Sequence, residues 1–210
     1  MSSKGRGEKL DPSGLDDYPT PAWCVHRLLE AWSPKLGSWV EPCAGSGNLV
    51  RAVDMCVEGE TRWTAYEINP HRHAELVCDV RRAVLGDFLR VGLVDLGVTA
   101  VITNPPYTQA QLFVEQCRSL YPEAEVVMLL RAGFLESDAR KKFWEEVGVP
   151  DLYVLPNRPS FRAEGDNGSL RTDSSLYAWF VWPPAFDPAR RSGRVELLGY
   201  TSLEDRKTWR

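Results

Sequence analysis

The chain has 210 residues, the length of one large domain. Hydrophobic residues make up 43% and charged residues 26%, a balance that excludes a wholly disordered or fibrous chain. The formal net charge of −4 excludes a polycation, although a local basic face for nucleic acid is compatible with it.

Apolar and β-branched runs alternate with segments of helical pattern. Strands are expected at 38–43, 62–68, 99–104, 125–131, 152–156 and 174–182. Helices are expected after Pro21 and at 47–57, 69–77, 109–121 and 137–147. This alternation predicts an α/β fold of three layers with mostly parallel strands. The last two strands have no helix between them, so we expect an antiparallel pair at the edge of the sheet.

The ends of the chain and its cysteines indicate the setting of this domain. Residues 1–16 are polar and predict a disordered leader, followed by one domain over 17–185 and a basic extension over 186–210. No apolar run approaches the ~20 residues of a membrane span. The five cysteines include no C-x-x-C pair and are interpreted as reduced thiols of a cytoplasmic protein. The three histidines lack ligand spacing, so no metal site is predicted.

A glycine pair follows the first expected strand. The strand ends in Glu41 and Pro42, and the chain continues to Gly45 and Gly47. Such glycines let the backbone turn tightly and approach a ligand, although a purely structural turn would also explain them. No G-K-[ST] follows, so this is not a phosphate loop, and the third glycine of the dinucleotide fingerprint is not at the expected place.

Three further residues fit the other parts of an adenosine. Glu67 ends the next expected strand, where a carboxylate can accept hydrogen bonds from both ribose hydroxyls. Asp87 and Phe88 offer an acceptor and a flat ring for adenine; alternatively, they are a turn residue and a core aromatic. A pocket for an adenosine without phosphate is most consistent with S-adenosylmethionine as the ligand.

The sequence Asn104-Pro105-Pro106-Tyr107 is the most specific pattern in the chain. Two consecutive prolines remove two N–H donors and fix φ, which gives a rigid corner with outward carbonyls. The Asn104 side-chain oxygen and the Pro105 carbonyl are suited to accept both protons of an NH2 group, while Tyr107 stacks on the plane that bears it. The pattern predicts direct in-line methyl transfer to such a nitrogen, without a nucleophilic cysteine or a metal.

In this order, these residues resemble the amino-methyltransferases that use S-adenosylmethionine. The segment from Glu41 to Gly47 is similar to their cofactor motif, Glu67 to their ribose-binding acid, Asp87-Phe88 to their adenine-binding pair and Asn104 to Tyr107 to their catalytic tetrad.

The chain also resembles one branch of that group, the small, phage-type DNA adenine-N6 methyltransferases. Tyr18-Pro19-Thr20-Pro21 is similar to their N-terminal motif, whose threonine lies near the methionine end of the cofactor. Residues 130–137, 158–161 and 173–179 resemble further stretches. The resemblance covers about residues 17–183 and implies that 17–185 form the catalytic domain. It implies a Rossmann-like methyltransferase fold with a mostly parallel seven-stranded sheet and an antiparallel C-terminal strand pair.

The resemblance implies a substrate site in the loop after Phe161. Larger members of the group carry a separate target-recognition domain, for which 210 residues leave no room. We therefore expect Phe161, Arg158, Arg162 and Arg171, together with the basic tail, to bind the substrate. Phe161 would stack on a flipped base, because adenine N6 is out of reach inside a duplex. Alternatively, Phe161 is a loop aromatic and the arginines form a solvated face.

The resemblance implies methylation of adenine N6 in DNA, with DNA as the partner and no membrane association. An RNA adenine methyltransferase keeps the same chemistry on another polymer. A protein glutamine-N5 methyltransferase shares the N-P-P-Y corner, but the Thr-Pro motif upstream and the aromatic loop argue against it. Cytosine-N4 methyltransferases more often resemble S-P-P-[YW], and the intact tetrad argues against a non-enzymatic cofactor sensor.

Overall fold

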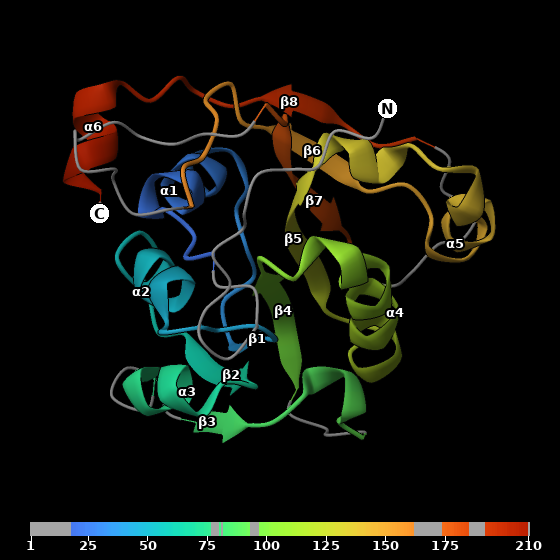
Figure 1. The fold of residues 1–210 in the computed structure, drawn as a ribbon, viewed down its shortest axis with the longest axis horizontal. Helices are drawn as coiled ribbons and strands as arrows, with labels where there is room; N and C mark the ends of the chain where they lie inside the picture. Colours follow the sequence, from blue (N-terminus) through green and yellow to red (C-terminus); the bar gives the residue numbers. More distant parts are fainter. Residues whose placement is uncertain are drawn as a thin grey trace, which may run out of the picture.

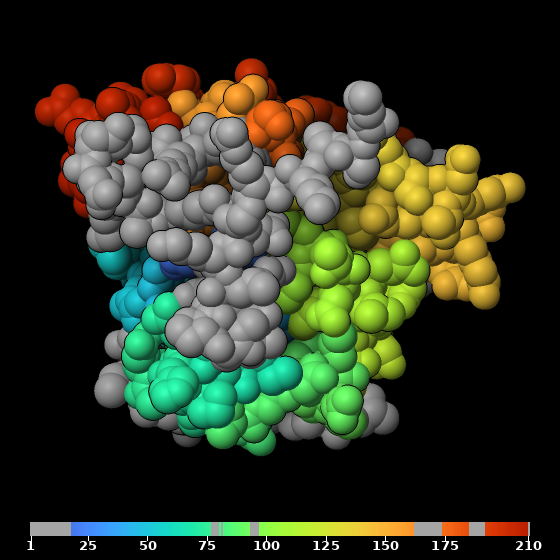
Figure 2. All heavy atoms as spheres, viewed as in Figure 1, coloured from blue at the N-terminus to red at the C-terminus, as the bar shows by residue number. Residues whose placement is uncertain are grey.

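The computed structural model describes residues 18–76, 80, 82–92, 97–161, 174–184 and 192–209. A sheet forms the centre and carries helices on both faces (Figure 1). One face is covered by α1 (Ala22–Ala31), α2 (Asn48–Asp54) and α3 (Pro70–Leu76), and the other by α4 (Ala110–Leu120) and α5 (Lys141–Val147). The space-filling view has α5, in yellow, and α6 (Leu203–Thr208), in red, at opposite ends of the molecule (Figure 2).

The sheet has eight strands in the order β3-β2-β1-β4-β5-β7-β6-β8. Their bounds are β1 Ser38–Glu41, β2 Arg62–Glu67, β3 Arg82–Leu85, β4 Val98–Thr103, β5 Glu125–Arg131, β6 Asp151–Val154, β7 Tyr177–Trp182 and β8 Val195–Leu197. The first five strands pair in parallel with one another, whereas β7 is antiparallel to both β5 and β6. The three-layer, mostly parallel, Rossmann-like fold with an antiparallel strand pair is therefore confirmed.

The strand count differs from the expected seven because β8 pairs with β6 in parallel and lies outside the antiparallel pair. The sheet therefore ends at β8. A strand of three residues is too short for a period-2 pattern, and its place depends on backbone hydrogen bonds, such as Leu152 N–H to the Arg194 carbonyl at 2.8 Å. The described part of the predicted extension thus contributes β8 and α6. The boundary at 185 stays a prediction, and the expected leader lies outside the described residues.

Short 3-10 helices lie after several of the strands. They are η1 Phe88–Arg90, η2 Tyr107–Gln109, η3 Ala132–Leu135 and η4 Asp138–Arg140. The helix expected at 137–147 therefore starts as η4 and becomes α5 only at Lys141. Within the described ranges, no helix is both long and apolar enough to cross a membrane.

Two apolar cores hold these layers together, one on each face of the sheet. β7 is buried along its whole length, and its side chains alternate between the cores. Trp179 lies in the core under α1 and α2, where its Nε1 donates to the Cys24 carbonyl at 3.0 Å. Phe180 lies in the other core, against α4 and α5. Because parallel strands end at the same edge, the ends of β1, β2 and β4 meet beside the candidate site.

Candidate functional site

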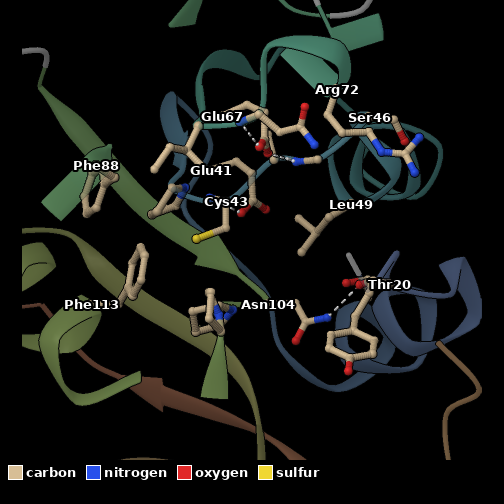
Figure 3. Close-up of a pocket in the computed structure, with 18 of the residues that line it drawn as sticks. Thr20, Glu41, Cys43, Ser46, Leu49, Glu67, Arg72, Phe88, Asn104 and Phe113 are labelled. Carbon is tan, nitrogen blue, oxygen red and sulfur yellow. Dashed lines mark hydrogen bonds between the residues drawn. The ribbon is translucent and has the colours of Figure 1, made fainter. Parts of the chain in front are cut away.

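A cavity of about 260 Å³ opens where β1, β2 and β4 end. The predicted cofactor and catalytic residues that line it are Thr20, Glu41, Pro42, Gly45, Glu67, Asp87, Phe88, Asn104, Pro105 and Pro106. Figure 3 shows several of these side chains around one hollow. Gly47 and Tyr107 lie beside the cavity in sequence but are not part of its lining.

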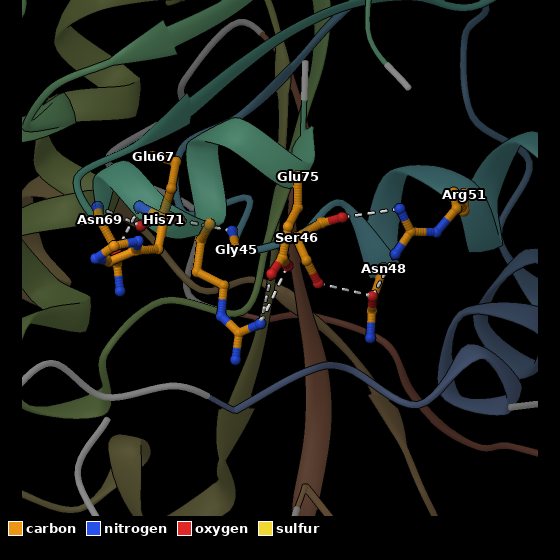
Figure 4. Close-up of polar contacts among 9 residues, drawn as sticks. Gly45, Ser46, Asn48, Arg51, Glu67, Asn69, His71 and Glu75 are labelled. Carbon is orange, nitrogen blue, oxygen red and sulfur yellow. Dashed lines mark hydrogen bonds and ion pairs between the residues drawn. The ribbon is translucent and has the colours of Figure 1, made fainter. Parts of the chain in front are cut away.

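Glu67 connects the end of β2 to the glycine loop. One carboxylate oxygen accepts from the Gly45 N–H at 2.6 Å, and the other accepts from the Asn69 N–H at 2.7 Å (Figure 4). An ionised carboxylate has about four acceptor positions, so two backbone bonds leave capacity for ligand hydroxyls. Gly45 has a φ of +53°, and a Cβ there would meet no atom within 4 Å. Its backbone thus faces open space in the cavity.

A second set of contacts braces the far side of the loop. Arg51 donates to the Ser46 carbonyl at 2.8 Å and to the Asn48 side-chain oxygen, which also accepts from the Ser46 hydroxyl at 3.1 Å (Figure 4). Gly47 precedes α2 with a φ of +88°, a conformation that favours glycine. Ser46, Asn48 and Arg51 were not singled out from the sequence, although the i, i+3 spacing of the last two on α2 is a usable signal.

Glu41 is the most buried acid of the cavity, at 1% exposure. Its Oε1 accepts from the Cys43 N–H at 3.1 Å, and its Oε2 is buried without a hydrogen-bond partner among the described residues. Burial raises the pKa of Glu41 to about 8, against the opposing effects of the Thr103 hydroxyl and the Cys43 N–H. Burial therefore favours the protonated form of Glu41. Burial also raises the pKa of the Cys43 thiol, which fits a filler rather than a nucleophile.

Asp87 and Phe88 have the structural roles that the sequence left open, a turn residue and a core aromatic, and they also line the cavity. Asp87 accepts from the Leu89 N–H at 3.0 Å and so caps η1, and it lies 3.3 Å from the exposed Arg90 guanidinium. Phe88 is 2% exposed and stacks on Phe113 with ring planes 5° apart. Asp87, Phe88 and Phe113 all line the cavity, and Figure 3 shows the two phenylalanine rings. Phe113 comes from α4, and its helical spacing indicates only a core residue.

Asn104 is fixed by a residue far away in the sequence. Its Nδ2 donates to the Tyr18 carbonyl at 3.1 Å, drawn as a dashed line in Figure 3. Because a carbonyl can only accept, this bond determines which end of the amide is nitrogen. The Oδ1 is buried and has no partner within the described part of the chain. Thr20, two residues after Tyr18, lines the same cavity.

An aromatic cluster of Tyr18, Tyr107, Phe161 and Tyr177 adjoins Asn104. The Phe161 ring centroid lies 5.2 Å from that of Tyr177 and 6.2 Å from that of Tyr18. Tyr107 lies 5.9 Å from Tyr177. Phe161 and Tyr107 thus both pack against Tyr177, although they lie far apart in the sequence. The sequence did not predict that Tyr177 belongs to this cluster.

The predicted substrate arginines are not part of the described site. Arg158 is exposed after β6 and does not line the cavity, while Arg162 and Arg171 lie outside the described residues. Among the side chains that the structure describes, no three His, Cys, Asp or Glu residues gather as metal ligands would.

No family model and no curated protein matches this sequence. Solved structures do. The methyltransferase subunit of a type I restriction-modification system from Streptococcus thermophilus matches with a TM-score of 0.60 and 14% identity, over 80% of this chain and 45% of that chain. A modification subunit assigned to a type I restriction enzyme from Vibrio vulnificus gives 0.59 and 17%, over 85% and 45%.

A third match is a dimethyladenosine transferase from Plasmodium falciparum, with a TM-score of 0.55 and 12% identity, over 80% of this chain and 62% of that chain. This chain spans less than half the length of the two restriction-modification subunits. At these identities the likeness concerns the fold, and the chain has the Rossmann-like fold that these methyltransferases share.

Proposed function

We propose that this chain is an S-adenosylmethionine-dependent methyltransferase that acts on the exocyclic N6 of adenine in DNA. The observation that carries the proposal is the state of Asn104. Its amide nitrogen is held by the Tyr18 carbonyl, and its Oδ1 is buried without a partner among the described residues. A buried acceptor without a donor costs free energy, and the N–H of a bound amine would supply the donor.

Three features of the cavity support S-adenosylmethionine as its ligand. Glu67 keeps acceptor capacity for the ribose hydroxyls, Gly45 leaves open space beside its backbone, and Phe88 presents an apolar wall for adenine. The volume of about 260 Å³ is close to the ≈ 300 Å³ at the lower end of ligand pockets. Among the described residues, Arg72 is the one arginine or lysine of the lining, which agrees with an adenosine that carries no phosphate.

When bound, S-adenosylmethionine supplies an electrophilic methyl on a sulfonium: the N–C bond forms as the S–C bond breaks, sulfur keeps the electron pair, and the nitrogen releases a proton to water. Asn104 Oδ1 and the Pro105 carbonyl accept from the amine and orient its lone pair. These hydrogen bonds strengthen as the nitrogen becomes tetrahedral, and so favour the transition state over the ground state.

A nucleobase suits the aromatic cluster better than a glutamine side chain does. Tyr107 and Phe161 are half-buried and pack against the buried Tyr177 beside Asn104, so their rings offer stacking area to a base that has left its helix. Two of the structural neighbours belong to restriction-modification systems, which favours DNA. The dimethyladenosine transferase supports an adenine amino group as the target in either polymer.

The test is nucleoside analysis of DNA from cells that lack adenine methylation of their own. Cells that produce the wild-type chain are expected to contain N6-methyl-deoxyadenosine, and their DNA resists restriction enzymes that this base blocks. Cells that produce the Asn104→Ala variant are expected to lack both signals. Unmodified DNA in both cultures, with methylated adenine in RNA of the wild type only, would contradict DNA as the substrate and leave the amine chemistry intact.

A further inference from the structure

Arg131 ends β5 at the edge of the sheet where Asn104 follows β4. β5 and β7 are antiparallel, and their register puts Arg131 directly opposite Tyr177. Directly opposite residues on neighbouring strands have adjacent side chains. The Arg131 Nε accordingly donates to the Tyr177 hydroxyl at 3.2 Å. The sheet therefore sets this pair before any ligand binds.

The same guanidinium also covers Tyr107. Its Cζ lies 5.0 Å from the centroid of the Tyr107 ring, within the range of a cation–π interaction. The Tyr177 ring lies 5.9 Å from Tyr107 at an interplanar angle of 52°. Tyr107 is thus contacted by a cation on one face and a buried tyrosine beside it, and Tyr177 itself is only 1% exposed.

We propose that Arg131 is a positioning residue that holds the Tyr107 ring in the orientation in which it stacks on the target base beside Asn104. This inference rests on the proposed function. With the guanidinium over one ring face, a base stacks on the opposite face, and the Arg131–Tyr177 bond stops the guanidinium from following a rotating ring.

The expected consequence is on turnover rather than on cofactor binding. A ring that is already ordered loses no further freedom when the base arrives, and the amine reaches Asn104 in a reactive pose. Without Arg131, the ring has more than one orientation, and only part of the bound base is correctly placed. Arg131 does not line the cofactor cavity, so the affinity for S-adenosylmethionine has no reason to change.

The chain offers a matched control in Arg194. Its guanidinium Cζ likewise lies 5.0 Å from a tyrosine ring, that of Tyr153, and it also donates to a tyrosine hydroxyl. This pair lies next to β6 and β8, and neither residue lines the cavity. Arg194→Ala therefore removes the same kinds of contact from a place without a proposed role.

The experiment measures kcat and KM for labelled methyl transfer to DNA, and the Kd for S-adenosylmethionine, on full-length chains. Arg131→Ala is expected to lower kcat by about ten- to a hundredfold, as misplaced reactants do, with Kd within about twofold of wild type. Arg131→Lys keeps a cation without the planar fork and is expected to have an intermediate kcat. Arg194→Ala is expected to match the wild type in all three quantities.

A second readout follows the base itself. With 2-aminopurine at the target position, wild type is expected to change the fluorescence on binding as the base leaves its stack, and Arg131→Ala to change it less. A wild-type kcat in Arg131→Ala, or an equal loss of kcat in Arg194→Ala, would overturn the inference while the proposed function stands. A wild-type chain that methylates no nucleic acid would instead refute the proposed function.

Discussion

The cavity and the aromatic cluster lie at the same edge of the sheet, but their side chains are held in different ways. In the cavity, backbone groups hold the polar side chains: two N–H groups bind Glu67, and one carbonyl binds Asn104. In the aromatic cluster, the side chains are held by contacts between rings and by the Arg131 guanidinium. Fixed acceptors recognise one arrangement of donors, whereas ring faces accept any flat base. Mutations in the two regions should therefore affect different functions: those in the cavity affect cofactor binding or turnover, and those in the aromatic cluster affect binding of the base.

The largest effect is expected for Asn104→Ala. Loss of the acceptor that orients the amine should lower kcat by about 10²–10³-fold, by comparison with the loss of one oriented hydrogen-bonding group in other active sites. The Kd for S-adenosylmethionine should stay within a few-fold, because Glu67 and the glycine loop are untouched. Asn104→Asp keeps an acceptor oxygen but loses the bond to the Tyr18 carbonyl, and should be intermediate. Equal losses of kcat and of cofactor affinity would contradict the assignment.

Glu67→Ala should instead weaken cofactor binding. Removal of a charge-assisted acceptor, together with the support of the Gly45 and Asn69 N–H groups, is expected to cost about 1–3 kcal/mol in affinity, measured by titration calorimetry. Asp54→Ala is the control: that carboxylate also accepts two hydrogen bonds, from Thr61 and Trp63, but lies outside the cavity lining. If both variants bind the cofactor as tightly as wild type does, the role of Glu67 is only structural.

Phe161→Ala tests the other region. Loss of one ring face is expected to raise the KM for DNA by roughly fivefold, equivalent to about 1 kcal/mol of stacking, with an unchanged Kd for S-adenosylmethionine. Trp144→Ala removes a partly buried ring from the distant Phe134–Phe143 group and should leave KM unchanged. A Phe161 variant with weaker cofactor binding and a normal KM would show that the two regions are not separate.

The smallest functional effect is expected for Glu41→Gln. This substitution should instead change how the free energy of unfolding depends on pH. The folded chain keeps a proton on Glu41 up to a pKa of about 8, whereas the unfolded chain releases it near 4.5. Between these values the folded state binds more protons, so Glu41 makes the free energy of unfolding fall as pH rises, by at most about 1.4 kcal/mol per pH unit.

Glu41→Gln removes this contribution and mimics the neutral acid, so the Kd for S-adenosylmethionine should stay within a few-fold. In urea titrations from pH 5 to 8, the variant should become progressively more stable relative to wild type as pH rises. Parallel pH profiles of the two proteins would mean that Glu41 is ionised in the fold.

The parts of the fold that were predicted correctly have strong local patterns. β5 and β7 are continuous apolar runs, and the lack of a helical sequence pattern between the last two expected strands correctly indicated the antiparallel pairing of β6 and β7. β3, β8 and α6 were missed because each is very short and lies among charged residues. Their positions depend on distant partners, such as the Thr201 hydroxyl, which accepts from Arg27 at 2.8 Å, and Trp209, whose ring lies 4.3 Å from His26.

The candidate site likewise contains residues that local sequence patterns predict and contacts that they do not. The cavity residues follow strand ends in recognisable motifs, and the structure brings them together as a lining. The pairing of Arg131 with Tyr177 was not predicted, because it arises from the β5–β7 register and has no sequence pattern of its own. The Asn104–Tyr18 bond joins residues 86 positions apart and likewise has no local signal.

The most direct test of the central claim uses purified wild-type chain and S-adenosylmethionine with a labelled methyl group. The methyl acceptors are three separate pools: unmethylated DNA, total RNA and a protein extract. We predict label in the DNA pool, recovered as N6-methyl-deoxyadenosine and absent with Asn104→Ala. Label recovered only as methylated glutamine in the protein pool would contradict the account, including the roles given to Phe161 and Arg131.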